Sequence, residues 1–171
     1  MIALALPLLV LSGPVVPVGT FDDYRFTAEH QYGYGVRLWR QGDTLYGTFA
    51  ASDGLAGDTP TGLIRNGRYG AGRDVSFTAE LVTGTHSCKV HPKGVPARKA
   101  YTFRGRITGD RLRGAVEAAD TLHPEIAPKR TPVVLEHRAG ESALGSYETK
   151  EEWEAAARKT WAIVEGNGGH P

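Results

Sequence analysis

Residues 34–51, YGVRLWRQGDTLYGTFAA, decide the fold because they form two alternating runs around Gly42-Asp43. A near copy, YTFRGRITGDRLRGAVEAA, occupies residues 101–119 and has Gly109-Asp110 at the equivalent place. Two apolar-alternating runs that flank such a two-residue signal predict a tight β-hairpin. The shared pattern G-D-x-L-x-G-x-[F/V]-x-A therefore predicts two similar hairpins within one antiparallel sheet.

A two-residue turn fixes which residues of each hairpin face each other. The predicted pairs are Arg40 with Leu45, Leu38 with Gly47, Val36 with Phe49, Ile107 with Leu112, Gly105 with Gly114 and Phe103 with Val116. Directly opposed residues share one face of a sheet, so both hairpins have an apolar face that includes the leucine after the turn. The reverse face is polar, and in the second hairpin it carries Arg104, Arg106, Arg111 and Arg113.

Four further segments alternate like short strands and are bounded by turn residues. They cover residues 23–30, 62–69, 75–82 and 133–138, while residues 52–60, 83–97 and 120–132 are predicted to be loops. With the two hairpins this makes about eight strands without intervening helices. Because closure removes exposed sheet edges, the pattern predicts an all-β, up-and-down antiparallel barrel.

The carboxyl-terminal part changes to a helical period. A capping box, an apolar stripe and a stop signal together predict a helix over residues 149–165. The pattern consists of Thr149 and Glu152, then Trp153, Ala157, Trp161 and Val164, and finally Gly166. We expect this helix to pack on the barrel over Trp39 and Tyr46, and residues 167–171 to form a disordered tail.

The chain of 171 residues has a formal net charge of +1, which favours no particular partner, and its length predicts one domain over residues 20–166. The lone Cys88 excludes an intrachain disulfide. Residues 1–19 are uncharged and apolar, and prolines interrupt them too often for a transmembrane helix. We interpret them as an export signal, which predicts a secreted or periplasmic protein; the alternative is a loose tail outside the fold.

An export signal, a meander of about eight strands and a carboxyl-terminal helix resemble the lipocalin-like, or calycin, barrels. The resemblance covers residues 23–164 and is one of architecture. The family's Gly-x-Trp at the first strand is missing, because residues 21–30 read FDDYRFTAEH. The resemblance implies a barrel that holds a small, mostly apolar or amphipathic molecule, and no binding residue is carried over from the family.

The inward face predicts the candidate ligand contacts. They are Arg40, Val36, Leu38, Phe49, Phe103, Gly105 and Gly114. Glycines in the middle of a strand mark either a sharp bend of a closed barrel or, alternatively, interior space left for a ligand. An inward arginine needs a partner, which is either a barrel-end carboxylate or the carboxylate of a ligand.

Other polar groups give weaker indications. His86, Cys88 and His91 could converge on zinc or copper, but a fourth ligand is not evident, and we predict no metal and no other cofactor. A polar set consists of Glu29, His30, Tyr32, Tyr34 and Arg40. The familiar catalytic motifs are missing, so binding is favoured over catalysis, and no catalytic residue is predicted.

The arginines of the second hairpin leave two alternatives open. Arg104, Arg106, Arg111 and Arg113 share one face, where they either contact an anionic surface or form an ordinary solvated wall. Aromatic side chains do not interleave with them, which argues against a nucleic-acid site. Two further functions remain as alternatives: a protein-binding module that acts through its loops, such as an inhibitor or envelope factor, and a cofactor-free enzyme that uses His30 or Glu29.

Overall fold

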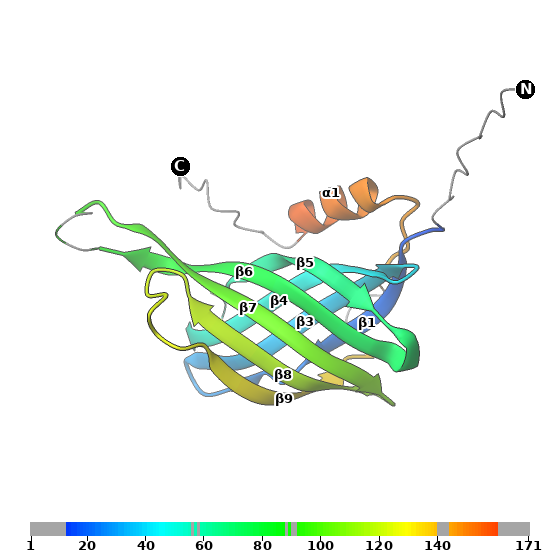
Figure 1. The fold of residues 1–171 in the computed structure, drawn as a ribbon, viewed down its shortest axis with the longest axis horizontal. Helices are drawn as coiled ribbons and strands as arrows, with labels where there is room; N and C mark the ends of the chain where they lie inside the picture. The colour runs from blue at the N-terminus through cyan, green and yellow to red at the C-terminus, as the bar shows by residue number, and fades with distance from the viewer. Residues whose placement is uncertain are drawn as a thin grey trace, which may run out of the picture.

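The computed structural model is an all-β barrel of eight antiparallel strands, closed in up-and-down order, with one carboxyl-terminal helix (Figure 1). The predicted fold class is therefore confirmed. The structure describes residues 13–55, 57, 59–87, 89, 92–139 and 144–160. In that part of the chain, no helix is long and apolar enough to cross a membrane.

The strands follow one another around the barrel in sequence order. Their bounds are β1 Val16–Asp22, β2 Arg25–Phe26, β3 His30–Gln41, β4 Thr44–Leu55, β5 Thr61–Tyr69, β6 Asp74–His86, β7 Val95–Thr108, β8 Arg111–Asp120 and β9 Lys129–His137. A 3-10 turn, Ala71–Arg73, connects β5 to β6. Strand β1 closes the ring because it pairs with β3 on one side and with β9 on the other, while the two-residue β2 only extends the pairing of β3.

Both hairpins have the register that their turns predict. All six predicted pairs are present, among them Val36 with Phe49 in the first hairpin and Phe103 with Val116 in the second. Gly42 and Gly109 have φ values of 59° and 60°, the left-handed conformation that a tight hairpin turn needs and that glycine adopts without a steric penalty.

The prediction of the first strand is wrong. Residues 23–30 contain only the short β2 and the start of β3, and the first barrel strand is Val16–Asp22. The first four residues of this strand, 16–19, belong to the stretch that the sequence pattern places outside the fold. The register shifts between Pro17 and Gly19, so a bulge breaks the alternation by which a strand is recognised. Residues 1–12 lie outside the described part of the chain, and an export signal there stays a prediction.

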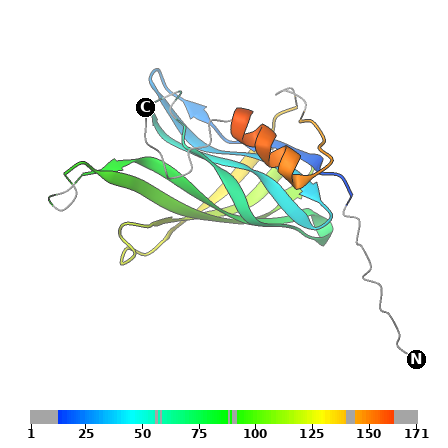
Figure 2. The ribbon, with the colours of Figure 1, turned by 90° about the horizontal axis from the view of Figure 1, so that it is seen from above.

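Three predicted loops are partly strand. Strands β6 and β7 continue to His86 and start from Val95, so much of residues 83–97 forms a long hairpin arm that projects from the barrel (Figures 1 and 2). Strand β4 runs on to Leu55. Strand β9 begins at Lys129 and contains Pro132. Proline is tolerated there because β9 pairs with β1 only through Glu136 and His137, which leaves the Pro132 side of the strand as an edge.

Helix α1, Lys150–Thr160, lies across the outside of the barrel, as predicted (Figure 2). The ring of Trp153 packs against Trp39 and Tyr46, with centroid distances of 5.7 Å and 5.6 Å. The Thr149 hydroxyl accepts a hydrogen bond from the Glu152 amide at 3.2 Å, which is half of the predicted capping box. The Glu152 carboxylate accepts from the Glu148 amide rather than from Thr149. Trp161, Val164, Gly166 and the predicted tail lie outside the described residues.

An ion pair between the buried Asp22 and the half-exposed Arg138 reinforces the closure between β1 and the end of β9. The Asp22 carboxylate, whose side chain is 6% exposed, accepts two hydrogen bonds from the Arg138 guanidinium at 2.6 Å and 2.9 Å. The Arg138 amide also donates to the Thr20 carbonyl at 2.9 Å. Since only two residue pairs join β1 to β9, these contacts are a large part of the seam.

We predict that Arg138→Gln lowers the free energy of unfolding by about 2 kcal/mol, because it leaves the Asp22 carboxylate buried without its charged partner. The matched control is Arg111→Gln, whose partner Glu136 is 44% exposed, and it should cost less than about 1 kcal/mol. Urea unfolding measures both. Equal losses in the two variants would show that the seam does not depend on this pair.

Candidate functional site

The two ends of the barrel differ in chemistry. The turn end carries the Gly42-Asp43 and Gly109-Asp110 turns, and the loop end carries the connections after β4, β6 and β8. At the loop end the inward positions, followed along the register, change from apolar to tyrosine and charged residues. We call them the loop-end ring: Tyr32, Tyr34, Asp53, Lys99, Asp120, Lys129 and Thr131.

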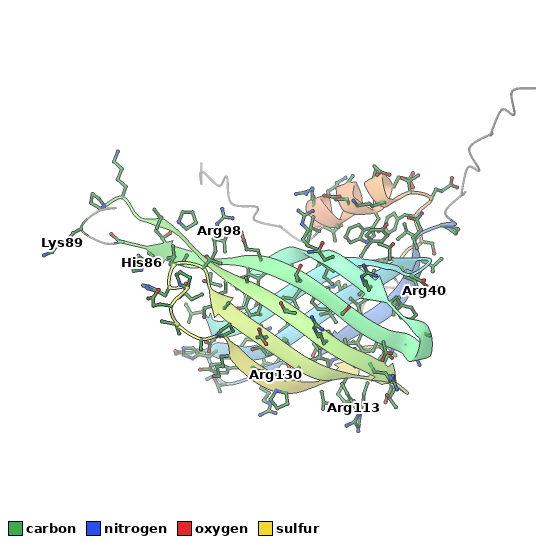
Figure 3. The ribbon with its side chains drawn as sticks, in the orientation of Figure 1. Arg40, His86, Lys89, Arg98, Arg113 and Arg130 are labelled. Atoms are coloured by element: carbon green, nitrogen blue, oxygen red, sulfur yellow. The ribbon has the colours of Figure 1, made fainter. Side chains whose placement is uncertain are left out.

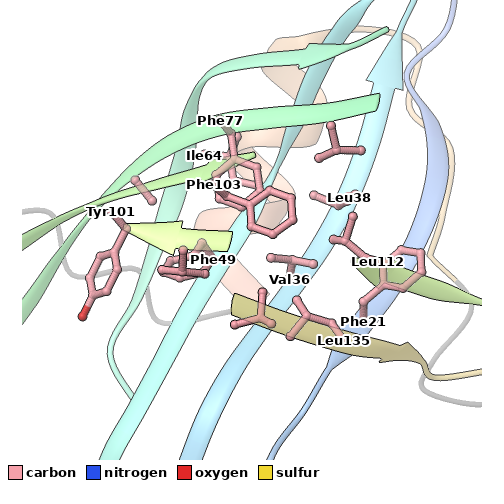
Figure 4. Close-up of a cluster of buried hydrophobic side chains, with 14 of the residues drawn as sticks. Phe21, Val36, Leu38, Phe49, Ile64, Phe77, Tyr101, Phe103, Leu112 and Leu135 are labelled. Carbon is pink, nitrogen blue, oxygen red and sulfur yellow. The ribbon is translucent and has the colours of Figure 1, made fainter. Parts of the chain in front are cut away.

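The turn end of the interior is filled by packed side chains (Figure 4). The Phe77 and Phe103 rings stack at 5.1 Å, and Phe49 contacts Phe77 at 5.7 Å. Four predicted ligand contacts belong to this cluster: Val36, Leu38, Phe49 and Phe103. Each is at most 2% exposed and packs against its neighbours, so these residues form the core on which the loop-end ring rests.

The inward glycines allow close packing. A Cβ on Gly105 would come within 2.7 Å of Phe103 Cζ and closer still to the Arg113 carbonyl oxygen. A Cβ on Gly114 would lie 2.9 Å from the same ring, and one on Gly47 would strike the Arg37 carbonyl oxygen. The space above Gly105 and Gly114 is thus taken by the Phe103 ring, and of the two alternatives the structure favours tight backbone approach in a curved wall.

The structure separates Arg40 from the other members of the predicted polar set. Arg40 lies at the turn end, far from the hairpin arm that carries His86 (Figure 3). Its guanidinium sits 5.3 Å from the centroid of the Tyr69 ring, and Nη1 donates to the Gly42 carbonyl at 3.5 Å. Tyr32 and Tyr34 lie in the loop-end ring, so they are not neighbours of Arg40.

Two tyrosines form the boundary between core and ring. Tyr101 packs on Phe49 at 5.1 Å, and its hydroxyl points away from the labelled core residues in Figure 4. Burial raises the pKa of Tyr101 to about 12, and Tyr34 and Asp53 add to the rise. Burial also raises the pKa of Tyr34, whose hydroxyl lies beside Thr131 of β9. Both phenols are therefore neutral hydrogen-bonding groups at neutral pH.

Asp23 holds Tyr34 in place from outside the ring. Its carboxylate accepts a hydrogen bond from the Tyr34 amide at 2.7 Å, and the Asp23 amide donates to the Tyr34 carbonyl at 3.1 Å. Burial raises the pKa of Asp23, while the bond from the Tyr34 amide opposes that rise. The strand that carries Tyr34 is thereby fixed just beyond the end of β1.

Three charged members of the ring lie on the neighbouring strands β7, β8 and β9, and the fourth, Asp53, lies on β4. Lys99 faces Asp120 across β7 and β8, and Lys129 faces Ala118 across β8 and β9. Neither lysine forms an ion pair with any residue that the structure describes, whereas Asp120 accepts a hydrogen bond from the Leu122 amide at 2.9 Å. Two ammonium groups near two neutral phenols suit the recognition of a carboxylate or another small anion.

The other candidate chemistry is not assembled in the described residues. His86 and His123 contact each other edge to face at 5.9 Å, while Cys88 and His91 lie outside the described part of the chain. Among the residues placed by the structure, no group of three or more His, Cys, Asp or Glu could hold a metal ion. His30 stacks on Tyr32 at 6.1 Å, and Glu29 is exposed outside any strand.

Comparison with known proteins gives no further information on this site. No family model matches the chain, and no curated protein and no solved structure matches it either. The loop-end ring therefore rests on geometry alone.

Sequence reasoning missed most of the ring. Lys129 and Thr131 fall in the predicted loop over residues 120–132, where a side chain has no defined face. Lys99 and Asp120 lie just outside the predicted hairpin strands. The signal that could have found them is the hairpin register itself, because continuing its alternation from Tyr101 and Ala118 places Lys99 and Asp120 opposite each other.

We predict that Gly105→Ala lowers the free energy of unfolding by about 2 to 3 kcal/mol, since the added methyl would overlap the Arg113 carbonyl and the Phe103 ring. Gly54→Ala in β4 is the matched control, because no heavy atom lies within 4 Å of that Cβ position. It should change stability by less than about 1 kcal/mol. Urea unfolding tests the pair, and a tolerated Gly105→Ala would instead indicate free interior space.

The raised pKa of Tyr101 predicts alkaline destabilisation. The unfolded phenol ionises near its model value of 10.0, whereas the folded one stays neutral up to about 12. The contribution of the neutral Tyr101 phenol to the free energy of unfolding is thus complete below pH 10. It is lost as pH rises from 10 to 12, at about 1.4 kcal/mol per pH unit. Tyr101→Phe should remove this part of the pH dependence in urea titrations at pH 8 to 11. If the free energy of unfolding fell equally with pH in the unchanged protein and in Tyr101→Phe, Tyr101 would not be the cause of the alkaline destabilisation.

Proposed function

We propose that this chain is an exported, non-catalytic binding protein that holds a small amphipathic molecule at the loop end of its barrel. The observation that carries the proposal is the division of the interior. The turn end is occupied by core side chains, while the inward positions at the loop end are mostly tyrosines, lysines and aspartates that are partly buried or exposed. A ligand therefore contacts the layer above Phe49 rather than the middle of the barrel.

The chemistry of the ring supports an anionic or strongly polar head group. Lys99 and Lys129 each present an ammonium group that forms no ion pair with a described carboxylate, although Asp120 stands opposite Lys99 in the register. Tyr34 and Tyr101 supply phenol hydroxyls beside an aromatic surface continuous with the core. Such a set offers charge-assisted hydrogen bonds to a head group and ring faces to an apolar part.

The architecture is consistent with this proposal. An eight-stranded up-and-down barrel is the frame of the lipocalin-like proteins that the sequence resembles, and it is just wide enough for packed side chains or one small ligand. Here packed side chains occupy the turn end of that interior. The family itself stays a proposal, as does export to the periplasm or outside the cell.

A second candidate function, binding of a partner protein, has a specific observation in its favour. Of the five large hydrophobic side chains that are exposed in the described chain, four belong to the loop end: Phe26, Tyr32, Leu55 and Ile126. Leu55 pairs with His30 at the rim, and Phe26 pairs with the neighbouring Gln31. Exposed apolar groups around a polar ring are typical of a surface that meets a partner.

Native mass spectrometry of the purified full chain, compared with its denatured mass, tests the first proposal. We expect a reproducible non-covalent mass excess of a small organic molecule. The double variant Lys99→Gln/Lys129→Gln should lose most of it, because the head group then has no ammonium partner. The matched control Arg68→Gln/Arg130→Gln changes the charge equally on the outer wall and should retain it.

Two outcomes would overturn the binding proposal: a chain whose native and denatured masses agree, or an excess that both double variants keep undiminished. If instead a protein is captured by the loop end and Leu55→Asp releases it, the second candidate function takes its place.

A further inference from the structure

The outer wall of strands β5 to β9 carries an unusual set of charges. Its cations are all arginine, and these strands, described along their whole length, place no lysine on this face. The outward arginines are Arg65, Arg68, Arg98, Arg104, Arg106, Arg111, Arg113 and Arg130. The outward carboxylates are Asp74, Glu80, Glu117 and Glu136. Eight against four leaves a net charge of +4 on this wall, which we call the arginine wall.

At the centre of the arginine wall, one of three arginines is paired with a carboxylate. Arg106 is held by Asp74 through bonds of 2.6 Å and 3.1 Å, and this contact lowers the pKa of Asp74. Arg104 and Arg113 form no ion pair with any residue that the structure describes. Arg113 also stands directly opposite Arg106 in the register, an arrangement of like charges that destabilises a sheet unless an anion lies nearby.

The part of the wall on β8 and β9 faces away from α1, whereas the outer face of β5 meets the helix at Leu63. Figure 3 places Arg113 and Arg130 on the opposite side of the barrel from α1, so no described element covers them. Between the arginines the outward residues are mostly small, such as Ser76 and Ala115. Val134, which is 40% exposed, pairs with Arg113 and adds an apolar group to the patch. The result is a convex cationic surface with long, partly apolar arginine stems.

We propose that the arginine wall docks the protein on an anionic phospholipid surface. A lipid surface is an extended anion that a convex wall can meet without a cleft, and each arginine near it adds to the attraction. The aliphatic stems of Arg104 and Arg113, together with Val134 on the neighbouring strand, can lie against the apolar edge of the lipid head groups. A nucleic acid or a sugar chain is less well matched, because the wall presents no aromatic ring on which bases or sugars stack.

Vesicle co-sedimentation of the full chain tests this proposal. We expect binding to vesicles of equal parts phosphatidylglycerol and phosphatidylcholine at low salt, little binding to phosphatidylcholine alone, and release as salt rises. Arg104→Gln/Arg113→Gln should weaken binding about thirtyfold, since each charge contributes about fivefold. The matched control Lys150→Gln/Lys159→Gln on α1 removes the same charge from the opposite side and should weaken it less than about threefold.

A second pair of variants keeps the charge. Arg104→Lys/Arg113→Lys should retain vesicle binding, because a membrane attracts any cation; loss of binding in this variant would overturn the proposal in favour of a site for one discrete anion. Equal weakening by the wall and helix variants, or binding to heparin without binding to the vesicles, would also overturn it. Thermal unfolding of each variant confirms that the barrel is folded, so that a loss reports on binding.

Discussion

The bidentate contact between the Asp22 carboxylate and the Arg138 guanidinium fastens the seam on which the barrel depends. Every other neighbouring pair of barrel strands shares at least four aligned residues, whereas β1 and β9 share two. Once the barrel is closed, alternate side chains of each strand point into the interior, where apolar residues are buried, and the others point to solvent. Apolar side chains at the turn end can pack to full density only because the ring is complete. The same closure gathers Tyr34, Lys99 and Thr131, from three separate strands, at one end.

The hairpins and the helix were predictable because local chemistry determines them. Gly42-Asp43 and Gly109-Asp110 set the register, and the register sorted inward leucines from outward arginines. Strand β1 was not predictable in this way, because Pro17 and the shift at Gly19 hide its alternation within an apolar stretch. The arm beyond Leu81 was missed for a different reason. Its strands leave the barrel, so neither face is buried and no alternation is required.

The candidate site could not be predicted from the sequence for a related reason. Long-range closure, not local pattern, brings Lys129 of β9 and Lys99 of β7 to the same end as Tyr34 of β3. The interior hydrophobic residues were correctly found, yet their number alone does not say whether they line a cavity or fill one. Gly105 and Gly114 decide that point, because their missing side chains admit the Phe103 ring and bring two strands close together. The barrel interior thus has a packed core at the turn end and the candidate site at the loop end, and the arginine wall lies outside.

The most direct test of this division is methyl NMR of the full chain during titration with decanoate, an amphipathic carboxylate. The account predicts that the methyl signals of Ala51, Ala118 and Thr131, near the loop-end ring, shift with added decanoate. The signals of the turn-end core, from Leu38, Leu112 and Leu135, should stay unchanged. Shifts that are largest in the three leucines would contradict the account, because they would place the ligand where the structure places a packed core.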